Sequence, residues 1–218
     1  METLLEIIDR ISFLASMPAI GGLLIALGIL LLAKRWPLQV TGVAILYFFV
    51  GLLHTRVIRP EVALIKALIG WLICLTLYIT GRHLDERRGD NEAAPEPAPT
   101  RRWLPPLADD TPLRLIVLLV AFVVAYAIST YLPLPQVAAH VGMACYLLAV
   151  AGLLLAGMSE DAIQVGMGLL VFLAGFDLFF GALEPSLAVA GLLGAAGFFI
   201  TLAVTFMAVT HAVSGEEG

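Results

Sequence analysis

The chain has 218 residues, of which 61% are apolar and 13% are charged, and its formal net charge is −5 at pH 7. Soluble domains are about 45–50% apolar and about 25% charged, so a water-soluble fold would lack the polar surface it needs. The apolar residues form runs long enough to cross a bilayer as helices, which takes about 20 residues each. We therefore expect an all-α membrane protein with seven transmembrane helices.

The first ten residues, METLLEIIDR, carry acidic side chains where a signal peptide has basic ones, so we expect them to be retained. Leu4, Ile7, Ile8 and Ile11 recur at helical spacing. This pattern is typical of a short amphipathic helix on the membrane surface. A simple extension of the first span is an equally good interpretation.

Seven apolar segments follow, separated by charges or prolines. The expected spans are residues 11–33, 38–54, 62–81, 115–132, 136–159, 162–183 and 186–213. They group into an N-terminal segment with a first three-helix block (1–81), a Pro-rich linker (82–112), an extra transmembrane helix (113–134) and a second three-helix block (135–218). The linker holds six of the twelve prolines and charges of both signs, which predicts an extended, disordered segment.

Lys and Arg in the loops predict the orientation, because basic loops stay on the cytoplasmic side. One side collects Lys34, Arg35, Arg82, Arg87, Arg88, Arg101, Arg102 and Arg114, and the other collects Arg10, Arg56 and Arg59. We therefore expect an inner-membrane protein with its N-terminus outside and with the linker and the C-terminus in the cytoplasm.

The two blocks resemble each other when the chain is shifted by 125 residues. Gln39-Val40 then falls on Gln164-Val165, and Pro60 falls on Pro185. Further matches are Ala63 with Ala188, Leu68 with Leu193, and Thr76-Leu77 with Thr201-Leu202. Both blocks start on the same side, so we expect a parallel repeat, as some transporters have.

Lys66 and Asp177 are ionisable residues well inside expected spans, about 9–10 Å below the outer helix ends. A charge there costs about 2.5–3.5 kcal/mol on the gentler scale and usually finds a partner, so we expect the two to face the interior and pair. Alternatively, Lys66 snorkels to the headgroups, and Asp177 stays protonated. His54, Arg56 and Arg59 are expected to be interfacial anchors, with His54 a secondary candidate for the pair.

Other chemistry is not indicated. Cys74 and Cys145 lie in the middle of spans and are expected to pack there, and the four scattered histidines have no metal-ligand spacing. We therefore expect no cofactor, no metal and no catalytic residue. Small residues at 190–195 form two small-xxx-small pairs, which predict close helix packing.

Two segments carry a family resemblance. Residues 173–177, Leu-Ala-Gly-Phe-Asp, resemble the glycine-x-glutamate signature in the second helix of the small K-type subunit of complex I, with Asp in place of Glu. Residues 66–70, continuing to Leu77-Tyr78, are similar to the third helix of that subunit, and Lys66 stands where that helix has its second glutamate. A chain of this length with two such blocks resembles the hydrogenase-4 component E family.

The chain also departs from that pattern. Gly191 and Gly194 stand where the last helix of the second block would have an acid, and residues 51–54, Gly-Leu-Leu-His, stand where the first block would have one.

The resemblance implies an accessory membrane subunit of a complex I-like or hydrogenase-like assembly, which does not catalyse a reaction alone. Lys66 and Asp177 would contribute to a proton path, and redox cofactors would lie on partner chains. We expect the lipid bilayer and other membrane subunits as partners, and no nucleic acid. A structural or assembly protein without chemistry and a small ion or solute transporter are the alternatives.

Overall fold

The computed structural model describes residues 17–33, 35–58, 60–91, 111–132, 134, 137–159, 161–183 and 186–214. The regular elements in these ranges are all α-helices: α2 (Met17–Leu32), α3 (Trp36–Val57), α4 (Pro60–Asn91), α5 (Thr111–Tyr131), α6 (Ala139–Met158), α7 (Ala162–Leu183) and α8 (Leu187–Ser214). Six of these helices, α3 to α8, are long and apolar enough to cross a membrane, and α2 contains the shorter apolar stretch Pro18–Leu32. The N-terminal amphipathic segment and most of the linker lie outside the described residues.

One helix boundary differs clearly from the expectation. The helix α4 continues to Asn91, whereas the sequence predicts a linker from Arg82 onward. Residues 82–88 include Arg, Leu and Glu, which favour helix, and the first proline after the span is Pro95. Nothing in the sequence therefore stops the helix at the end of its apolar part.

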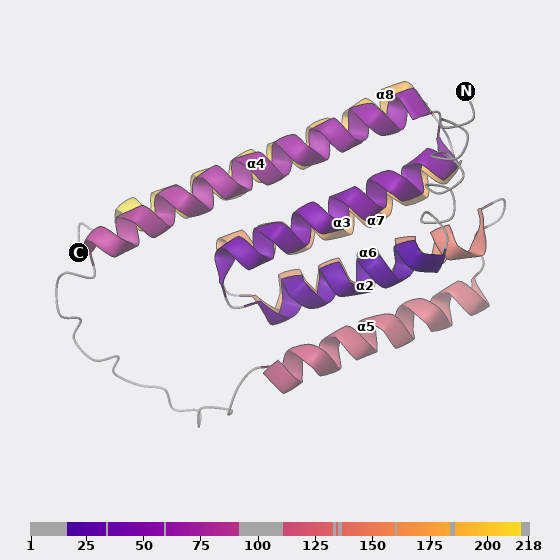
Figure 1. Ribbon diagram of the computed structural model, residues 1–218, viewed down its shortest axis with the longest axis horizontal. Helices are drawn as coiled ribbons and strands as arrows, with labels where there is room; N and C mark the ends of the chain where they lie inside the picture. The colour runs from indigo at the N-terminus through magenta and orange to yellow at the C-terminus, as the bar shows by residue number, and fades with distance from the viewer. Residues whose placement is uncertain are drawn as a thin grey trace, which may run out of the picture.

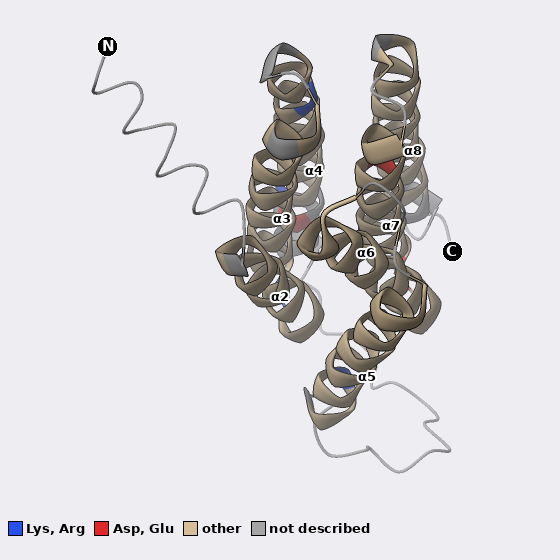
Figure 2. Ribbon diagram, turned by 90° about the vertical axis from the view of Figure 1, so that its right-hand side faces the viewer, with Lys and Arg blue, Asp and Glu red and all other residues tan. Residues whose placement is uncertain are grey.

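The helices form two groups of three with one helix at the edge. Consecutive helices run in opposite directions along the bundle (Figure 1). Figure 2 shows α2, α3 and α4 beside α6, α7 and α8. The two groups meet through contacts of α2 with α6, α3 with α7 and α4 with α8. The extra helix α5 contacts α6 and α2, and only 11% of its most apolar stretch is buried inside the bundle. It therefore packs peripherally, as its aliphatic composition predicts.

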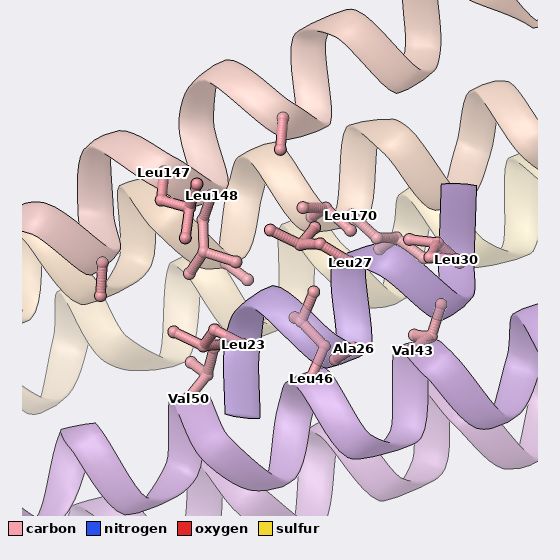
Figure 3. Packing of buried hydrophobic residues seen from close by; sticks show 14 of the residues in the cluster. Leu23, Ala26, Leu27, Leu30, Val43, Leu46, Val50, Leu147, Leu148 and Leu170 are labelled. Atoms are coloured by element: carbon pink, nitrogen blue, oxygen red, sulfur yellow. The ribbon is translucent and has the colours of Figure 1, made fainter. Parts of the chain in front are cut away.

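The core lies where the two groups face each other. Leu23 and Leu27 of α2, Leu46 of α3, Leu147 of α6 and Leu170 of α7 are almost completely buried (Figure 3). In lipid such packing gains van der Waals contact rather than hydrophobic transfer energy, so close approach matters most. This favours small residues at the helix contacts.

The closest backbone approach of this kind joins α6 to α7. A Cβ atom built on Gly168 would lie 2.5 Å from the backbone N of Ala156, and one on Gly175 would lie 2.9 Å from the carbonyl O of Cys145. Of the small residues expected to pack at 190–195, Gly194 lies close to α4, because a Cβ built on it would be 2.7 Å from Cδ1 of Ile69, whereas a Cβ on Gly191 meets nothing within 4 Å. The expected close packing of α8 thus occurs against a side chain of α4, while the closest approach to backbone joins α6 and α7, which the sequence did not indicate.

Polar side chains bind carbonyl groups at the end of α2. Arg114 of α5 donates from Nη1 to the carbonyl O of Leu31 at 2.9 Å, and the buried Gln39 donates from Nε2 to the carbonyl O of Ala33 at 2.9 Å. The last carbonyls of a helix have no partner within it. These two contacts therefore satisfy exposed backbone groups and attach α2 to its neighbours.

Candidate functional site

Three helices bring ionisable side chains to one level of the bundle. His54 lies three residues before the end of α3, Lys66 lies six residues after the start of α4, and Asp177 lies six residues before the end of α7. These three helix ends lie at the same end of the bundle (Figure 1). At 3.6 residues per turn, each side chain is within about two turns of that end.

The three side chains are in contact with one another. The Lys66 ammonium donates to Oδ1 of Asp177. The Nε2 atom of His54 lies 3.4 Å from Nζ of Lys66 and 3.4 Å from Oδ2 of Asp177. The exposed fractions of the side chains are 1% for His54, 8% for Lys66 and 19% for Asp177. We call these three residues the intramembrane cluster.

The contacts of Lys66, Asp177 and His54 distinguish between the alternative roles that the sequence allows for each of them. Lys66 points to Asp177 and does not snorkel, and Asp177 points between α3 and α4. The interfacial interpretation of His54 is wrong, because its ring is buried between helices. A residue near the end of a span can face either headgroups or protein, and its position in the sequence does not distinguish the two. The side chains of Arg56 and Arg59 lie outside the described residues.

The protonation pattern of the His54 ring follows from its second contact. Its Nδ1 atom lies 2.9 Å from the carbonyl O of Val50, one turn earlier in α3. A carbonyl oxygen only accepts hydrogen bonds, so Nδ1 must carry the hydrogen. In the neutral ring, Nε2 is then left with a lone pair that accepts a hydrogen bond from Lys66. The cluster in this state has no net charge.

Two small cavities adjoin the cluster, each of about 30 Å³. Lys66, Asp177 and Tyr47 line both of them. One cavity extends along Gly194 and Gly197 of α8, while the other extends along α3 past the His54 ring. A polar cavity of this size can hold a water molecule. Each cavity therefore has room for a water molecule beside the cluster.

The cluster is suited to holding and moving protons. It combines an imidazole, an ammonium and a carboxylate, all of which exchange protons with water. Among the described residues, no group of three or more His, Cys, Asp or Glu side chains could hold a metal ion. The carboxylate of Asp177, which a bound cation would need as a ligand, is already paired with the ammonium of Lys66.

Tyr47 is the residue of this region that the sequence analysis missed. It precedes His54 by seven residues on α3, so both lie on the same helix face. This seven-residue spacing is the sequence feature that could have identified Tyr47 as a neighbour of His54. Cys74 and Cys145 are both free thiols, half-buried and buried respectively, and neither lines the two cavities.

No family model matches the chain, and no curated protein or solved structure shows a significant match to it.

Proposed function

We propose that the chain is an accessory membrane subunit of a complex I-like or membrane-hydrogenase-like assembly, in which the intramembrane cluster contributes to a proton path. The observation that carries this proposal is the cluster itself: a partly buried Lys66–Asp177 pair with a buried imidazole and two water-sized cavities beside it. The redox cofactors of such an assembly would be bound by partner chains.

The energetics support a functional cluster. Buried ion pairs give little net stability, since well-packed apolar residues of similar volume stabilise as much or more. Ionisable residues inside membrane segments are therefore retained mostly where they serve ions or protons. The short resemblance around residues 66–70 and 173–177 points to a proton-translocating assembly. It agrees with the cluster in naming the same two residues.

The proposal includes seven spans. The sequence is uncharged from Ile11 to Ala33, which is long enough to cross a bilayer as a helix. This segment would be the first span, and α3 to α8 would be the other six. The positive charges then favour an inner-membrane protein with its N-terminus outside.

We also propose that the two groups of three helices are parallel repeats. Shifting α2, α3 and α4 by 125 residues nearly superposes their bounds on those of α6, α7 and α8. Thr80 donates to Oγ1 of Thr205 at 3.3 Å, across 125 positions. Ile69 and Gly194 are also 125 positions apart, and a Cβ built on Gly194 would lie 2.7 Å from Cδ1 of Ile69. Contacts between equivalent positions are expected where two parallel repeats pack about a two-fold axis.

Co-purification tests the proposal. The tagged chain should be extracted from its native membranes in mild detergent, and its partners identified. We expect large membrane subunits together with iron–sulfur proteins. Isolation of the chain alone, or with partners that carry no redox centres, would contradict the assembly that we propose.

Proton pumping by the isolated assembly tests the role of the cluster. Asp177→Asn should reduce pumping, because it removes the acid of the cluster. Asp161→Asn is the matched control: it removes an exposed carboxylate that accepts from the backbone N of Ile163 at 3.4 Å, and Asn serves equally well at a helix N-terminus. Equal pumping by both variants would exclude the cluster from the proton path.

A purely structural role is the second candidate. The cluster joins α3, α4 and α7, and therefore attaches one group of helices to the other. A cluster with only this role would lower stability when it is altered and leave pumping by the surviving assembly unchanged. The small cavities argue against transport of a solute larger than water.

A further inference from the structure

His54 is placed between two opposite charges. Its Nε2 atom is 3.4 Å from the ammonium of Lys66 and 3.4 Å from the carboxylate of Asp177. Its other nitrogen is held by the carbonyl of Val50 at 2.9 Å. The ring therefore has one fixed nitrogen and one nitrogen whose preferred partner depends on protonation.

We propose that Nε2 of His54 is the atom that takes up the proton in this cluster, and that Lys66 and Asp177 are positioning residues with opposed effects on it. This inference rests on the proposed function and deepens it, because it names the proton-accepting group. It makes the cluster a proton site that alternates between two hydrogen-bonding states.

The two states differ by one proton. In the neutral ring, Nε2 accepts a hydrogen bond from Lys66, and its lone pair faces Asp177 unfavourably. A proton delivered through water bonds to the Nε2 lone pair, and the resulting imidazolium donates to Oδ2 of Asp177. The hydrogen bond from Lys66 is then lost, and the net charge of the cluster rises from zero to +1. Release of the same proton to water restores the first state.

Few titratable groups face His54 from the neighbouring helices among the side chains that the structure describes. Lys66 comes from α4, Asp177 from α7, and Tyr47 from the same helix as His54. The helix α8 contributes only Leu193, Gly194 and Gly197 to the adjoining cavity, and none of these titrates. Within the described part of the chain, Lys66 and Asp177 are therefore the charged groups in contact with the ring.

Nitrogen-15 NMR of the histidine rings tests this in the full chain, purified in lipid nanodiscs. His54→Asn assigns the His54 signal among the four histidines of the chain. At high pH we expect a neutral ring with hydrogen on Nδ1 and none on Nε2, and at lower pH a proton on both. Hydrogen on Nε2 in the neutral ring, or no protonation throughout the pH range in which the chain stays folded, would overturn the proposal. This measurement needs no variant of Lys66 or Asp177.

Variants then test the opposed effects at the pH where the wild-type ring is half protonated. Lys66→Met removes a like charge and should raise the ratio of protonated to neutral ring by about tenfold or more. Asp177→Asn removes the opposite charge and should lower that ratio by a similar factor. The controls Lys66→Arg and Asp177→Glu keep the charges and should keep the ratio near that of the wild type. Unchanged ratios, or shifts of the same sign, would refute the opposed arrangement.

The failure of this inference is distinguishable from the failure of the proposed function, because the NMR measurement does not involve the host assembly. If the ring responds as expected while pumping is insensitive to Asp177→Asn, the proton site stands and the proposed function fails. If pumping falls while the ring does not respond, the proposed function stands and His54 is not the acceptor.

Discussion

At the level of single residues, the cost of burying Lys66 depends on Asp177. Each charge would be expensive alone at this depth, and the contact between them offsets much of that cost. Removing one partner leaves the other as an uncompensated charge between helices, while removing both leaves an apolar contact.

A double-mutant cycle should show this coupling. We expect Lys66→Met and Asp177→Leu each to reduce the free energy of unfolding by about 3–5 kcal/mol, the range for breaking a buried pair. The combined variant should lose less than the sum of the two single effects. The measurement is reversible unfolding of each variant in detergent. Single effects that simply add would show that the contact contributes no coupling.

The sequence identified Lys66 and Asp177 because a charge within an apolar run is visible without any structure. It named His54 only as a secondary candidate beside an interfacial role, and it did not single out Tyr47. Both residue types are common at membrane edges and in protein interiors, and only the rotation of α3 about its axis decides which way they point. That rotation is set by contacts with α2, α4 and α7, which a single sequence does not contain.

At the level of helices, the close packing of α6 on α7 depends on glycines, which have no side chain at the contact. Around Gly168 the opposing atoms belong to backbone, including the N and Cα of Ala156. Backbone cannot rotate away as a long side chain can, so an added methyl group must push the two helices apart.

Gly168→Ala should therefore destabilise the chain by about 1–3 kcal/mol, the usual cost of overpacking. Gly157→Ala is the matched control in α6, because a Cβ there meets nothing within 4 Å. It should be neutral or stabilising by up to about 1 kcal/mol, since Ala is the better helix former. Thermal unfolding in detergent compares the two. Equal effects would show that the close approach does not limit the packing.

The positions of the helices could largely be predicted, since charges and prolines delimit apolar runs. The helix α7 begins and ends at the residues that the sequence predicts. The end of α4 could not, because a charged segment with helix-forming residues gives no sign of whether it continues a preceding helix. Which glycines meet a backbone also depends on the helix pairs that pack together, and not on glycine spacing alone.

At the level of the whole molecule, the cluster breaks the proposed repeat. The positions that correspond to His54, Lys66 and Asp177 under the shift of 125 residues are Phe179, Gly191 and Leu52. Only one of the two equivalent places therefore carries ionisable groups. A proton path through the cluster would belong to one side of the proposed two-fold axis, while the other side provides packing.

The cluster is also displaced towards one end of the bundle, the end that holds the connection between α3 and α4. The distribution of Lys and Arg predicts that this end faces the outside. On the opposite side of the cluster, α4 and α8 contribute mainly apolar residues until Thr80 and Thr205. We therefore expect the cluster to exchange protons with the outer side more readily than with the cytoplasm.

The orientation can be tested with single cysteines at exposed positions on opposite ends of α6. Leu132→Cys lies before this helix and Asp161→Cys follows it, in a background in which Cys74 and Cys145 are replaced by Ala. A membrane-impermeant maleimide added to intact cells should label Leu132→Cys, and should label Asp161→Cys only after the membrane is opened. The cysteine-free chain controls for background labelling. The reverse labelling pattern would place the linker outside and the cluster near the cytoplasm. Residues 132 and 161 lie at opposite ends of α6, so their sides of the membrane fix the orientation of the whole bundle.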